Sequence, residues 1–313
     1  MTNFSADPRR AVGLTSEDAV TLADTRMTTD RPGENAPSDG HIDVGILTKG
    51  KPTLGMALAS LLLQDEVDLR IHVVDTSARP VINRDDVRYA LRLAADRRVH
   101  CSYEYSGESD IAFSNGKARL ILALSGTHLC LMDDDVVVPA KALGQLLETA
   151  RAKQVYGYVS PFCKNSPVLH GPLGKQTPYT PGSLIYQDDL VRRILLEYYE
   201  TTVDVLDRRR SDRKVWETAF LTALFDVLGR PRIRQADLMT YHLDYQEDPN
   251  WIDEERTVIA RSTAIAHELA QKSYATVPRP ASNPASQRVV YDLSRPTQRG
   301  WARRARRVLP WIR

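Results

Sequence analysis

Strand-like and helix-like segments alternate along the first half of this chain, and the alternation limits the folds it can adopt. Four short runs are rich in apolar residues and bounded by turn residues, as buried strands are; they cover residues 41–48, 68–75, 99–106 and 129–132. Segments with apolar residues at helical spacing follow the first three runs, at 54–64, 85–98 and 116–124, and a fourth covers 140–152. The pattern predicts an α/β fold with a mostly parallel, Rossmann-like central sheet flanked by helices.

The second half is less regular. Strand-like runs cover 156–162, 183–187 and 238–243, and helical spacing covers 188–199, 215–228 and 253–272. Between 164 and 181 the sequence is rich in Gly and Pro, which predicts a long loop. Long loops inside compact domains usually carry function.

Length and composition exclude several classes of protein. A chain of 313 residues with 42% hydrophobic content can bury the core of one large domain or two joined halves. Its net charge of +2 gives no argument for nucleic acid as a partner. Cys101, Cys130 and Cys163 lack the spacing of a metal site, and we expect them to be reduced. Because no apolar run is long enough to span a bilayer and no signal core is present at the start, we predict a cytoplasmic protein.

The two ends differ from the middle. Residues 1–40 show no sustained apolar period and are predicted to be a disordered leader. Residues 273–313 form a Pro/Arg-rich basic tail. At its end, Arg299–Arg313 mixes Arg with Trp and aliphatic residues, which suits either a peripheral helix on an anionic membrane or a disordered basic tail.

Three consecutive aspartates follow the apolar run 129–132, in the sequence THLCLMDDDVVVPA. In open α/β sheets, ligands bind at the carboxyl ends of strands, and carboxylates there supply the oxygen ligands that Mg²⁺ or Mn²⁺ prefers beside a phosphate. Strand alternation points Asp133 and Asp135 to one side and Asp134 to the other. The alternative is a solvated acidic loop that caps the next helix.

Several motifs together resemble the GT-A fold glycosyltransferases, most closely the inverting enzymes of family 2. The opening GILTKGKPTLGMALASLLLQ resembles the family's first strand, which ends in Thr, here Thr48, and its first helix. VVDTSA resembles the second strand, whose Asp contacts the base, and Asp75 has that place. NGKARLILALSG places Lys117 where the family has an Arg near the nucleotide, and LMDDDVV matches the Asp-x-Asp motif.

The resemblance implies a role for each of these residues. It covers roughly residues 41–243 and implies a GT-A domain over 41–272, with a nucleotide-sugar half at 41–139 and an acceptor half at 140–272. Nucleotide-sugar contacts are expected from five residues: Thr48, Asp75, Lys117, Asp133 and Asp134. Metal ligands are expected from Asp133 and Asp135. Within the trio, the family often places the ribose on the first carboxylate and the metal on a later one.

The second half supplies the remaining candidates. In KVWETAFLTALFDVLG, Glu217 has the place of the family's catalytic base, which takes the proton from the acceptor hydroxyl, with Trp216 beside it in the pocket. The alternative is an acid that favours the positive end of its own helix. His242 in TYHLDY resembles the histidine that completes the metal site in many GT-A enzymes, and imidazole suits Mn²⁺. Gly182 and Ser183 resemble the turn beside the donor sugar, although a Gly after Pro is also an ordinary turn.

The implied activity is sugar transfer from a nucleotide-diphosphate donor to an acceptor hydroxyl, with Mn²⁺ or Mg²⁺ and with inversion at the anomeric carbon. A retaining GT-A enzyme is the first alternative, and a non-catalytic nucleotide-sugar-binding module on the same fold is the second. A nucleotidyltransferase is a further alternative, but ILTKGKPTL lacks the Gly-rich loop with Arg and Lys with which such enzymes open.

Overall fold

A computed structural model describes six stretches of the chain: 41–106, 113–164, 177–204, 214–243, 251–274 and 289–292. All of them belong to one compact unit, Asn35–Arg313. The predicted leader, most of the loop 164–181 and the segment Arg299–Arg313 lie outside the described residues. Among the described helices, none is long and apolar enough to cross a membrane.

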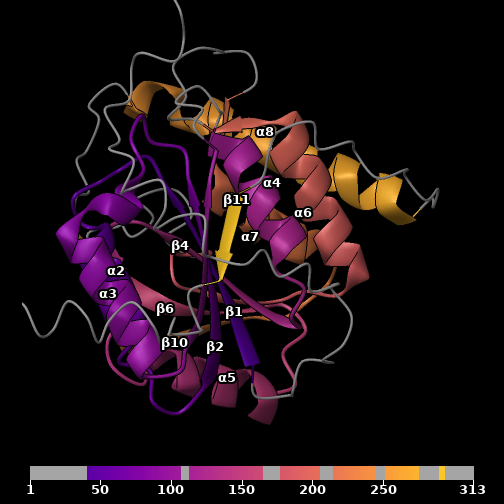
Figure 1. The fold of residues 1–313 in the computed structure, drawn as a ribbon. Coiled ribbons are helices and arrows are strands. Elements are labelled where there is room, and N and C mark those ends of the chain that lie inside the picture. The colour runs from indigo at the N-terminus through magenta and orange to yellow at the C-terminus, as the bar shows by residue number, and fades with distance from the viewer. Residues whose placement is uncertain are drawn as a thin grey trace, which may run out of the picture. The chain divides into compact units, whose positions relative to one another are not determined.

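Four parallel strands form the first half of the sheet, as the sequence predicts (Figure 1). They are β1 (His41–Thr48), β2 (Asp68–Asp75), β3 (His100–Tyr105) and β4 (His128–Asp133), in the order β3-β2-β1-β4. The connecting helices are α2 (Leu54–Leu61), α3 (Asp85–Asp96) and α4 (Phe113–Ala123), with a 3-10 turn η2 (Val81–Asn83) before α3. From β1 the chain builds outward to β3 and then returns to place β4 on the other side of β1. The order therefore reverses between β1 and β4, which is where α/β sheets open a crevice for ligands.

Within the described stretches, the second half extends the same sheet to nine strands. The short β7 (Leu184–Tyr186) runs antiparallel between β4 and β6 (Tyr158–Lys164), and β10 (Arg232–His242) lies parallel to β6. At the two edges, β5 (Val136–Val137) pairs antiparallel with β10, and β11 (Val289–Asp292) pairs antiparallel with β3. Six of the nine strands thus run in one direction, so the prediction of a mostly parallel sheet is confirmed.

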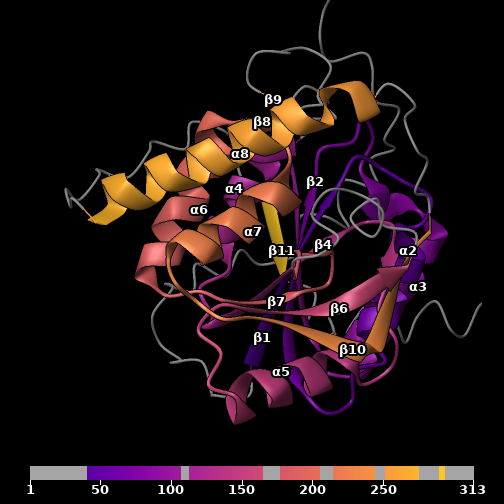
Figure 2. The ribbon, with the colours of Figure 1, turned by 180° about the vertical axis from the view of Figure 1, so that it is seen from behind.

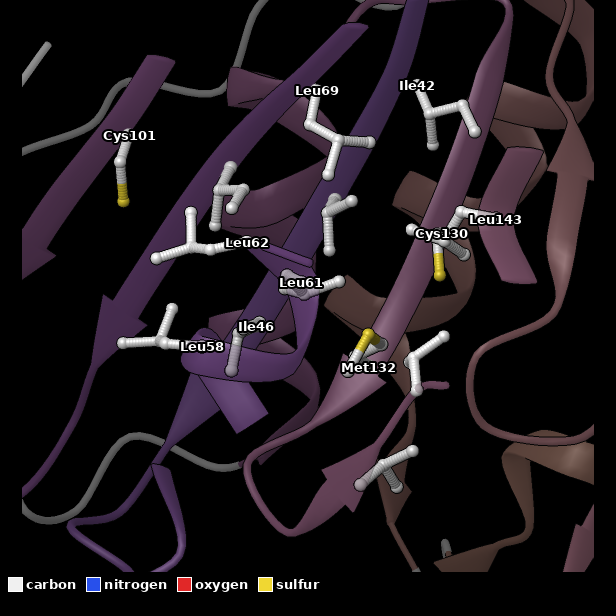
Figure 3. Close-up of a cluster of buried hydrophobic side chains, with 14 of the residues drawn as sticks. Ile42, Ile46, Leu58, Leu61, Leu62, Leu69, Cys101, Cys130, Met132 and Leu143 are labelled. Carbon is white, nitrogen blue, oxygen red and sulfur yellow. The ribbon is translucent and has the colours of Figure 1, made fainter. Parts of the chain in front are cut away.

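Helices cover both faces of the sheet (Figures 1 and 2). On one face, α2, α3 and α5 (Ala142–Ala152) pack on the alternate β1 residues Ile42, Val44 and Ile46. Part of this core is shown in Figure 3, where Cys101 and Cys130 lie among aliphatic side chains; all three cysteines are buried. On the other face lie α4, α6 (Asp189–Thr201), α7 (Glu217–Val227) and α8 (Trp251–Tyr274), which share a second core with Leu47 of β1.

Four features differ from the sequence prediction. The strand β5 has two residues, too few to show a period. The strand expected at 238–243 begins six residues earlier, at Arg232, because β10 continues along β6 past an irregularity between Gln235 and Met239. The pair β8 (Val203–Asp204) and β9 (Lys214–Val215) is only two residues long in each strand, too short to show a period. Within the predicted tail, β11 pairs with the edge strand β3. Its strand conformation comes from that long-range pairing.

Candidate active site

The candidate residues lie at the carboxyl ends of the parallel strands. Thr48, Asp75 and Asp133 are the last residues of β1, β2 and β4, so one edge of the sheet presents all three. Because β1 and β4 flank the reversal of strand order, Thr48 and the aspartate trio lie at the edge where open α/β sheets bind ligands.

The three aspartates divide as the strand alternation predicts. Asp134 turns toward β1, where it accepts a hydrogen bond of 2.6 Å from the Thr48 hydroxyl. Burial raises the pKa of Asp134 to about 6, and the charges of Asp135 and Asp133 add to the rise against the hydrogen bond from Thr48. Asp134 is therefore buried, with 6% of its surface exposed, and its hydrogen bond connects the ends of β4 and β1.

Asp133, Asp135 and His242 gather on the opposite side. Each offers one ligand atom, and these three atoms lie within 4.8 Å of one another. His242 Nε2 is 3.0 Å from Asp135 Oδ1, and the backbone N–H of Leu243 donates to the Asp135 carbonyl at 2.8 Å. The pairing of β10 with β5, which matches His242 with Val136, brings the histidine to the aspartates.

This donor set fits a divalent cation. Carboxylate oxygens with one imidazole suit Mn²⁺, and an ion that holds its ligands at about 2.1 Å draws them to within about 4.2 Å of each other. The spread of 4.8 Å among the three ligand atoms is close to this distance. Burial lowers the pKa of His242, but the hydrogen bond to Asp135 and the neighbouring carboxylates raise it overall, so a proton and a metal ion compete for this imidazole.

Lys51 is a member of the site that the sequence prediction missed. Its Nζ donates a hydrogen bond to Asp135 Oδ2. Burial raises the pKa of Asp135, but His242 and then Lys51 bring it below the ordinary value. The signal in the sequence was its position, three residues past the end of β1 and so at the edge where open α/β sheets bind ligands.

The loop that carries Lys51 is held by its backbone. Gly50 has a φ of 93°, which favours glycine, and its N–H donates to the Thr48 hydroxyl at 2.9 Å. Arg84, at the start of α3, donates to three successive carbonyl oxygens of this loop: Gly50 at 3.2 Å, Lys51 at 2.6 Å and Pro52 at 2.8 Å. The backbone is thus fixed while the lysine side chain extends toward the aspartates.

Glu217 begins helix α7 and faces the trio through Lys117. The Lys117 ammonium donates to Glu217 Oε2 and lies 3.7 Å from Asp133 Oδ1. Tyr199 of α6 donates its hydroxyl to Glu217 Oε1. Burial, together with the charge of Glu217, raises the pKa of Tyr199 well above its ordinary value, so this phenol stays a donor. One lysine therefore connects the predicted metal ligand Asp133 to the predicted base.

Asp75, a predicted nucleotide contact, has its carboxylate oxygens hydrogen-bonded to groups of the protein itself. Asp75 is fully buried, and its carboxylate accepts hydrogen bonds from the Ser77 and Val81 N–H groups at 2.9 and 2.8 Å and from the Tyr103 hydroxyl. These bonds fix the loop after β2, and the predicted contact of Asp75 with a base stays a prediction.

Gly182 and Ser183 form the turn before β7. Gly182 has a φ of 83°, which is the left-handed conformation of a turn. The Ser183 hydroxyl is fully buried, 2.7 Å from Ser160 Oγ, and donates to the Thr180 carbonyl at 2.5 Å. Trp216 precedes α7, where its backbone N–H donates to Ser262 of α8 at 2.9 Å. The roles predicted for these three residues beside a sugar stay predictions.

No protein-family model matches the chain, and no curated protein matches it. Among solved structures, it is similar to a mannosyltransferase from Pyrobaculum calidifontis in complex with GDP-Man and Mn²⁺, at 14% identity over 79% of this chain and 78% of that one, with a TM-score of 0.48. It is also similar to S. aureus TarS, at 13% identity over 75% of this chain and 43% of that one, with a TM-score of 0.47. TarS 1–349 in complex with UDP-GlcNAc gives 11% identity, coverage of 75% and 71%, and a TM-score of 0.47. Identities this low leave the function to be inferred from the site residues themselves.

Proposed function

We propose that this chain is a glycosyltransferase that moves a sugar from a nucleotide-diphosphate donor to an acceptor hydroxyl, with Mn²⁺ or Mg²⁺ and with inversion at the anomeric carbon. The observation that carries the proposal is the Lys117 ammonium, which contacts both Asp133 and Glu217. It brings a carboxylate suited to proton transfer close to a donor set suited to a cation, at the ligand-binding edge of the sheet. Sugar transfer needs both groups, one on each side of the anomeric carbon.

The donor lies on the side of the strand ends. Asp133, Asp135 and His242 would hold the ion, which when bound neutralises charge on the departing diphosphate. The nucleoside would lie against Thr48, Asp75, Asp133 and Asp134. Lys117 adds a second positive charge near the diphosphate. Thr48, Asp75 and Asp133 are the last residues of their strands, so the nucleotide would meet a rigid edge.

The acceptor lies on the side of α7, with Trp216, Gly182 and Ser183 as the predicted pocket. The acceptor oxygen attacks the anomeric carbon and forms the new carbon–oxygen bond as the bond to the diphosphate oxygen breaks. Its proton passes to Glu217, and the electron pair of the broken bond leaves with the diphosphate. Lys117 and Tyr199 hold both oxygens of Glu217 in one orientation, and each oxygen keeps a lone pair for the proton.

Donor turnover in the presence of Mn²⁺ tests this proposal. A screen of uridine, guanosine and thymidine diphosphate sugars should find one that the protein hydrolyses slowly or transfers. Glu217→Gln should lower the rate by about 10²-fold or more, because general base catalysis contributes on this scale. Asp135→Asn should abolish the dependence on Mn²⁺.

Glu66→Gln is the matched control, because Glu66 also pairs with a lysine, Lys141 at 2.7 Å, but on an exposed surface. Its rate should equal that of the natural protein. Retention of configuration in the product, read by NMR, would exclude the role given to Glu217 and favour the retaining alternative. If Glu217→Gln and Asp135→Asn both kept the rate of the natural protein, the site would be rejected. Binding of nucleotide sugars without turnover would favour the non-catalytic module.

We further infer that the protein acts in the cytoplasm and contacts anionic membranes through Arg299–Arg313, which suits a hydroxyl acceptor at a lipid surface. Co-sedimentation with vesicles that contain an anionic lipid, compared between the full chain and a version that ends before Arg295, tests this contact. Equal sedimentation of the two proteins would reject it.

A further inference from the structure

Lys51 lies on the carboxylate that a metal ion needs. Its ammonium is hydrogen-bonded to Oδ2 of Asp135, while His242 faces Oδ1. We propose that Lys51 is an exchangeable cation: it holds Asp135 while no metal is bound, gives up that oxygen when the ion binds, and then contacts the diphosphate of the donor. The exchange with metal stands on the site alone, and the contact with diphosphate rests on the proposed function.

Burial of Asp135 makes a cation necessary at this position. The Asp135 side chain is 2% exposed, and a carboxylate this deep is strongly destabilising unless a positive charge or several donors accompany it. Lys51 supplies that charge from a fixed loop backbone. The metal-free site is therefore already assembled, with the Lys51 ammonium on Asp135 in place of the metal ion.

Lys51 cannot keep this position beside a bound ion. A divalent cation on Asp135 would lie within a few ångströms of the ammonium, and like charges at that distance repel strongly in a buried site. The ion and Lys51 therefore compete for one carboxylate, and the affinity measured for the ion is lowered by the free energy needed to displace the lysine.

Exposure distinguishes Lys51 from the second lysine of the site. The Lys51 side chain is 40% exposed, whereas that of Lys117 is 3% exposed and lies between Glu217 and Asp133. Lys51 can move away from Asp135 on its four methylene groups while Arg84 holds its backbone. A displaced ammonium is within reach of phosphate oxygens on the ion, and lysine binds phosphate well as a point charge.

Binding of Mn²⁺ alone, measured by electron paramagnetic resonance of the free ion or by calorimetry without nucleotide, tests the exchange. Lys51→Met removes the competitor, so the protein should bind Mn²⁺ at least about fivefold more tightly. Lys51→Gln should shift the affinity in the same direction and serves if the first variant folds poorly. Lys49→Met removes an equal charge from an exposed residue of the same loop and should change the affinity less than twofold. Asp135→Asn should lose Mn²⁺ binding with or without the lysine change.

Unchanged or weaker Mn²⁺ binding in both Lys51 variants would overturn the exchange, as would an equal increase in Lys49→Met or the absence of Mn²⁺ binding by the natural protein. The second measurement is the affinity of the protein for UDP and for GDP in the presence of saturating Mn²⁺. Whichever binds the natural protein should bind Lys51→Met at least about fivefold more weakly, opposite in sign to the effect on Mn²⁺. Equal nucleotide affinity, or no binding of either nucleotide, would overturn the diphosphate contact.

The exchange and the proposed function fail separately. Tighter Mn²⁺ binding by Lys51→Met in a protein that turns over no nucleotide sugar would sustain the exchange and reject the enzyme. If the natural protein transfers sugar and Lys51→Met binds Mn²⁺ no more tightly, the enzyme would be sustained and the exchange rejected.

Discussion

Asp43 is a buried carboxylate that fastens three segments of the fold together at the end of the sheet away from the site. It lies on β1 with no exposed surface and accepts two hydrogen bonds from Arg70 of β2, at 2.8 and 2.5 Å. It also accepts from the Gly126 N–H, before β4, at 2.6 Å, and lies 2.7 Å from His41 Nε2. Asp43→Asn replaces one acceptor oxygen by an amide that points its own hydrogens at these donors.

The expected cost follows from these partners. Loss of one partner of a buried pair costs about 3–5 kcal/mol, but Arg70 is about a third exposed and can recover water, which reduces the figure to about 1 kcal/mol. An unsatisfied Gly126 N–H adds about 1–3 kcal/mol. We therefore expect Asp43→Asn to lower the free energy of unfolding by about 2–4 kcal/mol at pH 7.

The pH dependence has a definite sign. Burial raises the pKa of Asp43, but His41, Arg70 and Gly126 together lower it below its ordinary value. A carboxyl with a lowered folded pKa stabilises the protein above its unfolded pKa of about 3.9, and this contribution is lost as the pH falls through the folded pKa. The difference in free energy of unfolding between Asp43→Asn and the natural protein should therefore be largest at pH 6–7 and decrease in acid.

Urea unfolding followed by circular dichroism between pH 3 and pH 7 measures this gap. Asp85→Asn is the matched control, because Asp85 also pairs with an arginine, Arg88 at 2.6 Å, but is 95% exposed. Exposed pairs of this kind contribute about 0–1 kcal/mol. Equal stability of Asp43→Asn and Asp85→Asn at pH 7, or a gap that does not depend on pH, would refute the reasoning.

Three further predictions concern the site and its support. Tyr199→Phe removes a donor from Glu217 and should lower the rate of transfer about tenfold with the KM for the donor unchanged; in steady-state kinetics, a change confined to KM would contradict the positioning role. Asp134→Asn should stabilise the metal-free protein by about 1–3 kcal/mol above pH 6, because the pKa of Asp134 is raised to about 6 and ionisation there opposes folding. That gain should vanish below about pH 4 in urea titrations with a chelator, and a gain that persists in acid would contradict it. Gly116→Ala places a methyl group 2.4 Å from Leu47 Cδ1 and should cost about 1–3 kcal/mol, and the double variant with Leu47→Ala should lose less stability than the sum of the two single changes.

Local sequence pattern predicted the first half of the sheet because each of its strands is buried on both faces. An apolar run such as that of β4 has one stable environment, and the helices between such runs show their buried stripe in the sequence. The side of each aspartate also followed from the strand period, which turned Asp134 toward Thr48 and left Asp133 with Asp135. The second half was harder to predict, since β5, β8 and β9 have two residues each and β11 depends on β3.

Contacts between residues far apart in the chain could not be predicted from the sequence pattern. Lys51 and Asp135 are separated by 84 positions and Lys117 and Glu217 by 100, and nothing in the local pattern links either pair. Only the return of the chain from β3 across β1 to β4 brings Lys51 to the aspartates, and only the packing of α4 with α6 and α7 brings Lys117 to Glu217 and Tyr199.

The sequence by itself thus determined the α/β class, the strand ends that carry polar side chains and the side on which each aspartate lies, because these follow from periods of two and 3.6 residues. The tertiary structure decided which cation meets which carboxylate. Asp75 and Ser183 are hydrogen-bonded inside the protein. Asp135 pairs with Lys51 and His242. Glu217 accepts hydrogen bonds from Lys117 and Tyr199. Ion pairing depends on distances of a few ångströms between side chains, and those distances exist only after the whole sheet and its two helical layers have packed.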